Sequence, residues 1–229
     1  MSGIVGSKLN IRGSGRIAKL GTDGQVLTSS GAGGGANYED AAGGGAWTLI
    51  STETLGADVT PWDIDDIFTS TYDIYKMFIT DFSCTGSGAS SYVDAQLLVS
   101  GTAQTGDYRT LYSQAYALIE GANTVYGVSG GDWATAIRFE DSARNNDVGT
   151  ATDYLGQFEF TFYRPQDSVV NNQGSFMSTV CTGSATYNNY VYNGSWMYTS
   201  AVAATGIRFI ANNGDMSAGS IVRTYGISR

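Results

Sequence analysis

Histidine is absent from this chain of 229 residues, and that absence excludes most familiar hydrolytic chemistry. Without histidine there is no Ser-His-Asp or Cys-His catalytic pair, no histidine-ligated metal and no side chain whose unperturbed pKa lies near neutrality. Cysteine is almost absent as well. Cys84 and Cys181 lie far apart without a CxxC pattern, so each is expected to be a buried apolar residue and not a redox or metal group.

Long apolar runs and charged residues are also scarce. No stretch of 18 apolar residues occurs, so no transmembrane helix is expected, and the opening MSGIVGSKLNIRGSGRIAKLG lacks the apolar core of a secretion signal. Charged residues make up 14% of the chain, with 21 acids against 12 bases and a net charge of -9. This charge argues against nucleic-acid binding by the bulk of the protein. A chain of this length buries roughly 70% of its unfolded surface, enough for one core without disulfides or metal.

The few basic residues are concentrated at the N-terminus. Lys8, Arg12, Arg16 and Lys19 lie within the first twenty positions, where no acid occurs. The other 209 residues carry 8 bases and 21 acids, a net charge of -13. Such a division is typical of an arm that binds an acidic neighbour, and the alternative is a solvated, disordered tail.

Glycine is abundant where the basic arm ends. Residues 31–45, GAGGGANYEDAAGGG, contain seven glycines and form the single low-complexity segment. Glycine allows the backbone of a linker to adopt angles that other residues reach only with strain. The sequence therefore predicts an attachment arm and linker at 1–45 and a distal domain at 46–229.

From residue 46 onward, short strand-like stretches alternate with turn-forming residues. In Gln157–Tyr163, Phe158, Phe160 and Phe162 share one face, so these rings should point into a core, while Glu159, Thr161 and Tyr163 share the other. Further strands are expected at Trp47–Leu55, Tyr75–Phe82, Tyr92–Val99, Arg109–Ile119, Ala134–Phe139, Ser175–Cys181, Ile207–Ala211 and Ile221–Ile227. About ten such strands predict an all-β, antiparallel β-sandwich of jelly-roll-like type, preceded by an extended Gly-rich N-terminal arm.

Two local patterns stand out within this domain. The pair Asn193-Gly194 is the favoured centre of a two-residue hairpin turn. A turn there would place Tyr190, Tyr192 and Met197 on one face and Val191, Trp196 and Tyr198 on the other. Since only one face can enter the core, aromatic rings on the other face would be exposed to solvent or to a partner, and such rings can stack on sugar rings. Ordinary sheet packing or a subunit interface is the alternative. The candidate receptor-binding residues are Tyr190, Tyr192, Trp196 and Tyr198.

The second pattern is Thr60-Pro61-Trp62-Asp63, which offers a cap, a first-turn proline and an early acid. Ile64 and Ile67 follow at helical spacing, so a brief helix is expected here.

Catalytic motifs are incomplete. Gly127-Val128-Ser129-Gly130-Gly131 matches G-x-S-x-G, but that motif requires a histidine base. Paired carboxylates could still serve a glycosidase. On so acidic a chain, most of the candidates are expected simply to face water; they are Asp63, Asp65, Asp66, Glu120, Glu140, Asp141 and Glu159. The sequence therefore predicts a protein that is not an enzyme and needs no cofactor or catalytic metal.

The N-terminal arm resembles the attachment segment of tailed-bacteriophage virion proteins. The resemblance rests on two runs, Gly6–Gly15 (GSKLNIRGSG) and Leu20–Gly33 (LGTDGQVLTSSGAG), the second being similar to a block that recurs in tail fibres and appendages, commonly of marine phages. The closing Gly219–Ile227 (GSIVRTYGI) is similar to the last strand of many such proteins. Residues 46–218 take no part in the resemblance.

The resemblance implies an N-terminal segment, usually trimeric, that fixes a β-rich distal domain to the particle. The basic residues would contact acidic virion surface, and the apolar ones would anchor the arm. The implied attachment residues are Lys8, Leu9, Ile11, Arg12, Arg16, Lys19, Leu20, Val26 and Leu27. The implied partners are other virion proteins, two further copies of the chain in a homotrimer, and a host surface glycan or protein. The protein would be made in the host cytoplasm and located in the virion.

Two functional classes remain open at this point, and a third is less favoured. The first is a tail fibre or appendage whose distal domain attaches to the host surface. The second is a capsid decoration or head-fibre protein that stabilises or coats the shell. A polysaccharide depolymerase is the third, and it would depend on paired carboxylates. The number of copies per particle separates the first two classes.

Overall fold

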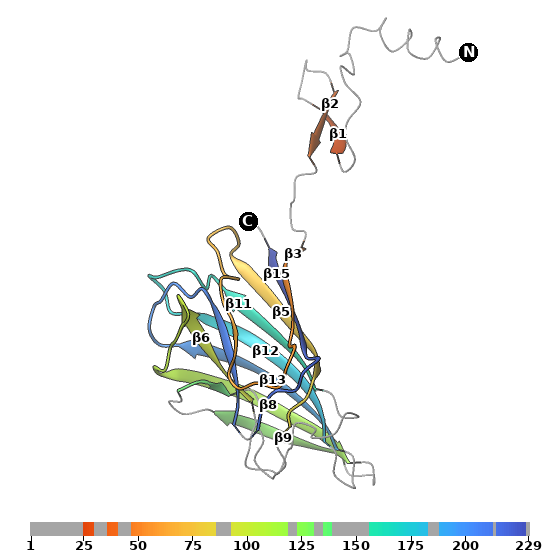
Figure 1. Ribbon diagram of the computed structural model, residues 1–229, viewed down its shortest axis with the longest axis vertical. Coiled ribbons are helices and arrows are strands. Elements are labelled where there is room, and N and C mark those ends of the chain that lie inside the picture. Colours follow the sequence, from red (N-terminus) through yellow and green to blue (C-terminus); the bar gives the residue numbers. More distant parts are fainter. Residues whose placement is uncertain are drawn as a thin grey trace, which may run out of the picture. The chain divides into compact units, whose positions relative to one another are not determined.

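The computed structural model describes residues 25–29, 36–40, 47–85, 93–118, 123–130, 135–138, 156–182, 188–212 and 214–227. The chain divides into two compact units, Met1–Gly44 and Gly45–Arg229. Every regular element in the described ranges is a β-strand, which confirms the all-β class (Figure 1). These ranges contain no helix long and apolar enough to cross a membrane.

The first unit contains an antiparallel pair, β1 (Gln25–Ser29) and β2 (Ala36–Asp40). Gln25 is paired with Asp40, and Ser29 with Ala36. Within the predicted linker over residues 31–45, Ala36–Asp40 is a strand, because the backbone of this stretch is hydrogen-bonded in a ladder with β1. The expected arm is thus partly strand.

The second unit contains two antiparallel sheets. The larger has the strand order β3 (Trp47–Thr54), β15 (Ile221–Ile227), β5 (Ile74–Phe82), β11 (Gly156–Tyr163), β12 (Gln173–Thr182), β13 (Asn188–Tyr198), β8 (Tyr108–Leu118) and β9 (Asn123–Gly130). The smaller has the order β10 (Ile137–Arg138), β6 (Val93–Val99), β14 (Gly206–Ala211) and β4 (Trp62–Ile64), with β7 (Thr102–Ala103) also paired to β6. In Figure 1 the strands β5, β11, β12, β13 and β8 lie side by side.

The core lies between these sheets, as the alternation of phenylalanines predicted. Phe158, Phe160 and Phe162 are all buried, and each contributes about 1.5 to 3 kcal/mol relative to an exposed side chain. The rings of Phe160 in β11 and Phe209 in β14 lie 5.9 Å apart, so the contact joins the two sheets. This packing confirms the antiparallel β-sandwich. Cys84 is also buried, as expected.

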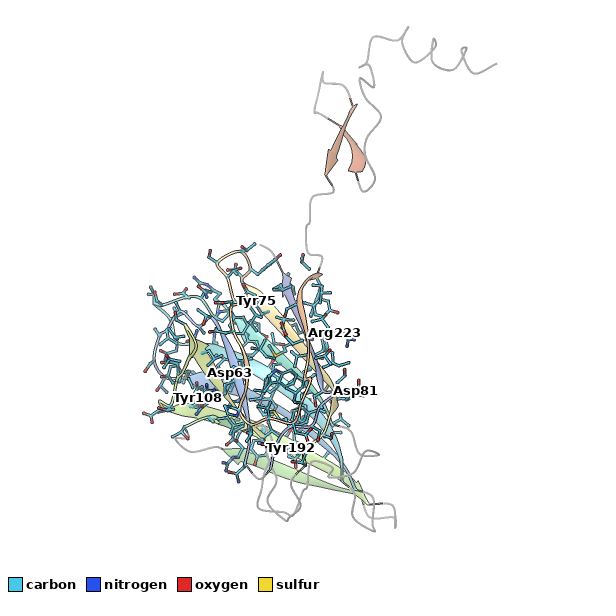
Figure 2. The ribbon with its side chains drawn as sticks, in the orientation of Figure 1. Asp63, Tyr75, Asp81, Tyr108, Tyr192 and Arg223 are labelled. Carbon is cyan, nitrogen blue, oxygen red and sulfur yellow. The ribbon has the colours of Figure 1, made fainter. Side chains whose placement is uncertain are left out.

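Tyr108 connects the sheets through its hydroxyl group. Its ring is fully buried against Tyr198, with ring centroids 4.6 Å apart. The hydroxyl accepts a hydrogen bond from the backbone N–H of Leu97 in β6 at 2.9 Å and donates one to the carbonyl of Gln104 at 3.0 Å. Burial disfavours the phenolate and raises the pKa of Tyr108 well above its ordinary value. Figure 2 labels this residue.

The predicted hairpin at Asn193-Gly194 is wrong. Strand β13 runs without interruption through both residues and is paired along its whole length with β12 and β8. Gly194 lies opposite Phe176, and a Cβ atom on Gly194 would lie 2.4 Å from the Phe176 ring. The glycine therefore provides room for a neighbouring aromatic ring within the sheet, which is a role that a turn motif does not reveal.

The predicted helix near Thr60 is also wrong. Trp62–Ile64 forms β4, which is paired with Ile207–Phe209 of β14. Trp62 and Ile64 are buried while Asp63 is exposed, which is the two-residue period of a strand. Pairing with β14 satisfies the backbone and overrides the helix-capping pattern.

Candidate binding face

The structure places three of the four candidate receptor-binding aromatics in the core. Because β13 is continuous, Tyr192, Trp196 and Tyr198 share one face, and they are 0%, 3% and 5% exposed in the core. Tyr192 is labelled in Figure 2. The Tyr190 side chain lies outside the described residues. Rings enclosed between two sheets cannot stack on a ligand in solution, so these positions stabilise the fold.

The candidate attachment residues lie in the first unit. Val26 and Leu27 belong to β1, where they are paired with Glu39 and Tyr38 in the backbone ladder. The remaining candidates lie outside the described residues: Lys8, Leu9, Ile11, Arg12, Arg16, Lys19 and Leu20. Their contact with a virion partner stays a prediction.

Three of the four described candidate carboxylates form structural contacts, and the fourth, Asp66, is exposed. Asp63 binds the Arg208 guanidinium through two contacts of 2.6 Å, and Glu159 forms an ion pair with Lys76. The Asp65 carboxylate accepts a hydrogen bond from the Thr205 hydroxyl. Glu120, Glu140 and Asp141 lie outside the described residues. Over the described ranges, no three His, Cys, Asp or Glu side chains gather as metal ligands would.

The outward face of the eight-stranded sheet carries most of the exposed large apolar side chains. Seven such side chains are exposed in the described part of the chain, and five of them lie on this face: Trp47, Leu49, Leu111, Tyr163 and Met177. They alternate along β8, β11 and β12 with buried residues. Exposed apolar area gathered on one face is typical of an interaction surface, so we call this surface the outer face.

One part of the outer face is an aromatic cluster over β3, β5 and β15. The ring of Trp47 lies 6.3 Å from that of Phe78 and 6.1 Å from that of Tyr225. The ammonium of Lys76 lies 5.2 Å from the centroid of Trp47 and is also paired with Glu159. The ammonium is attracted both to the faces of the rings and to its carboxylate partner.

The second part of the outer face is a groove of about 520 Å³ over β8, β11, β12 and β13, which we call the outer groove. Its lining residues are Arg109, Thr110, Leu111, Tyr163, Gln173, Gly174, Ser175, Ser195, Trp196 and Met197. Two rows of neighbours cross it from strand to strand, namely Tyr163–Gln173–Met197–Arg109 and Ser175–Ser195–Leu111. Its volume lies within the usual range for small-ligand sites.

The connection between β11 and β12, residues 164–172, holds Tyr163 and Gln173 in place. The Gln166 side-chain amide donates to the carbonyls of Phe68 and Ala204, at 2.7 and 2.6 Å. The Asn172 side-chain amide donates to the carbonyl of Pro165 at 2.9 Å. These bonds link the connection internally and to segments distant in the sequence. The backbone at its two ends, next to Tyr163 and Gln173, is therefore held in position.

Asp167 orders the outer part of the same connection. Its carboxylate accepts hydrogen bonds from the backbone N–H groups of Val169 and Val170, at 2.8 and 3.3 Å, and forms an ion pair with Arg164. The bond from Val169 is the main reason that the pKa of Asp167 lies below its ordinary value. Val169 itself is 84% exposed.

The described lining of the outer groove offers binding chemistry. It contains one guanidinium, one amide, serine and threonine hydroxyls and the side chains of Tyr163 and Trp196, and none of these described residues carries a carboxylate. Sequence reasoning missed Arg109, Gln173 and Ser195 as groove residues, because only strand register brings them together. One signal was available: the alternation in β11 placed Tyr163 opposite the core phenylalanines, and this is confirmed by its 42% exposure.

Comparison with known proteins does not assign the chain to a family. No protein-family model matches the sequence, and no curated protein is similar to it. Among solved structures, an aerolysin-like protein of Bombina maxima aligns over 74% of this chain and 97% of that chain, with 10% sequence identity and a TM-score of 0.08. A TM-score this low carries no inference about fold or function.

Proposed function

We propose that the protein is a non-enzymatic structural component of a tailed-bacteriophage virion. In this proposal it is a tail fibre or appendage, attached as a trimer through residues 1–45, with its β-sandwich directed toward the host surface. The observation that carries the proposal is the run Leu20–Gly33, which is similar to the attachment block of such proteins.

Two further observations support this function. The basic residues Lys8, Arg12, Arg16 and Lys19 belong to the proposed attachment arm, while the rest of the chain is acidic. This division suits an arm that binds an acidic virion protein and a distal unit that remains soluble. The outer face also leaves large apolar side chains exposed, as a surface that meets a partner does.

The decisive experiment locates and counts the chain on intact particles by cryo-electron microscopy. A few trimers at the tail support the proposal. Hundreds of copies over the capsid lattice would instead identify a decoration or head-fibre protein. Absence from purified particles would refute a virion role altogether.

A charge-reversal experiment tests the attachment arm. Arg12→Glu with Arg16→Glu should lower incorporation into particles, since the arm would then repel an acidic partner. Arg164→Glu, which reverses a charge on an exposed connection of the sandwich, is the control and should be incorporated normally. Equal incorporation of the arm variant and the native chain would refute electrostatic attachment.

A further inference from the structure

The chemical character of the outer groove restricts what it can bind. Among the described residues that line it, Arg109 is the single charged one, and none carries a carboxylate. A divalent cation takes several oxygen ligands, including carboxylates, and the described lining residues offer it no carboxylate. A purely apolar ligand would cover the Gln173 amide and the serine hydroxyls without forming hydrogen bonds to them, at a free-energy cost for each polar group that it buries.

The arrangement of these groups suits a flat, polyhydroxylated ring. Tyr163 and Gln173 are direct cross-strand neighbours, and Met197 and Arg109 continue the same row. At a strand spacing of about 4.8 Å, the row extends about 14 Å from Tyr163 to Arg109. An aromatic ring therefore lies at one end and a planar guanidinium donor at the other, with a planar amide between them.

The second row supplies smaller polar groups beside the first. Ser175 and Ser195 are cross-strand neighbours, and each hydroxyl can both donate and accept a hydrogen bond. Leu111 ends this row and is 50% exposed, so it adds apolar contact area. A pyranose ring presents the same combination of features, because its hydroxyl groups lie around the rim and its C–H groups form an apolar face.

The backbone of the outer groove is already ordered without a ligand. The bonds of Gln166 and Asn172 fix the connection from which Tyr163 and Gln173 emerge, and the other lining residues lie within paired strands. Because the backbone that carries the lining side chains is already ordered, binding a small ligand requires no ordering of the backbone, which favours affinity.

We propose that the outer groove binds pyranose residues of a polysaccharide, with Tyr163 stacking on the sugar face and Gln173 and Arg109 donating to hydroxyl or carboxylate oxygens. This inference rests on the proposed function, since it identifies the class of host-surface molecule that the sandwich recognises. Neutral hexoses and uronic acids share the required ring, and only the uronic acids add a carboxylate for the Arg109 fork.

The test measures binding of defined oligosaccharides to the purified full-length chain by saturation-transfer NMR and calorimetry. The probes are cellotetraose, maltotetraose and chitotetraose as neutral sugars, and trigalacturonate as the acidic one. We expect saturable binding of at least one probe. Whether the neutral or the acidic probes bind identifies the class of sugar. Failure of every probe to bind would overturn the inference.

Three variants show whether bound sugar occupies this groove. Tyr163→Ala should weaken binding about tenfold through loss of the stacking ring, whereas Tyr163→Phe should bind as the native chain does. Gln173→Ala should weaken it about twofold to tenfold through loss of a hydrogen bond. Trp47→Ala is the matched control, because Trp47 is as exposed as Tyr163 and lies on the same outer face outside the groove lining. An equal loss in Trp47→Ala and Tyr163→Ala would overturn the assignment.

The outcomes separate this inference from the proposed function. A chain that occurs on the virion but binds none of the probes overturns the groove assignment and leaves the virion role standing. A chain that binds sugar through Tyr163 but is absent from particles refutes the virion role and supports the groove.

Discussion

The hydroxyl of Tyr108 provides a stringent test of the packing between the two sheets. Tyr108→Phe keeps the buried ring and its contact with Tyr198 while deleting one oxygen atom. That oxygen is the hydrogen-bond partner of the Leu97 N–H and of the Gln104 carbonyl. The substitution therefore leaves a buried N–H without a partner at the junction of β8 and β6.

The magnitude follows from the cost of an unsatisfied buried donor, which is about 1 to 3 kcal/mol. In a domain of this size, each kcal/mol lowers the melting temperature by about 2 to 4 °C, so we expect a decrease of roughly 2 to 12 °C. The assay is urea and thermal unfolding followed by far-UV circular dichroism. Tyr163→Phe is the control, since its hydroxyl lies on the outer face, and it should change stability by less than about 0.5 kcal/mol.

The pH dependence of the free energy of unfolding provides a second test of the role of the Tyr108 hydroxyl. Burial raises the pKa of Tyr108 in the folded state above the unfolded value of about 10. The stabilisation is therefore complete below pH 10 and is lost as pH rises from there toward the folded pKa. The difference in free energy of unfolding between the native chain and Tyr108→Phe should shrink above pH 10. A difference that is absent at pH 7, or that widens above pH 10, would refute the reasoning.

Two further predictions concern β13 and the connection beside the outer groove. Gly194→Ala should destabilise the fold by about 1 to 3 kcal/mol in urea unfolding, because its Cβ would lie 2.4 Å from the Phe176 ring and 2.6 Å from the Leu111 carbonyl oxygen; an unchanged midpoint would contradict the continuous strand. Asp167→Asn should be less stable than the native chain at pH 7, with the difference vanishing as pH falls below about 4. The reason is that the folded pKa of Asp167 is lowered, so its contribution is present above the unfolded pKa of about 3.9 and is lost as pH falls through the folded value. A difference that persists at pH 2 would show that the charge plays no part.

The sequence by itself was sufficient for the fold class and for most strands. The alternation of Phe158, Phe160 and Phe162 with polar residues predicted both the strand and its buried face, because side chains in a strand project to opposite sides in turn. Strands of high β-propensity, such as Tyr75–Phe82 and Ile221–Ile227, were located to within a residue. Local pattern is enough where the buried face of a strand differs clearly from its exposed face.

Tertiary structure decided the features whose cause lies on another strand. Asn193-Gly194 has the local pattern of a turn, yet both residues are extended because β12 and β8 pair with them, and the Phe176 ring of β12 occupies the space above Gly194. The continuous β13 also explains why the predicted receptor-binding residues Tyr192, Trp196 and Tyr198 lie in the core and not on the surface. The outer groove is assembled from four strands, and Arg109 and Tyr163 line it together only through the register of β8, β13, β12 and β11. Register depends on pairing between distant segments, so no local pattern in the sequence specifies it.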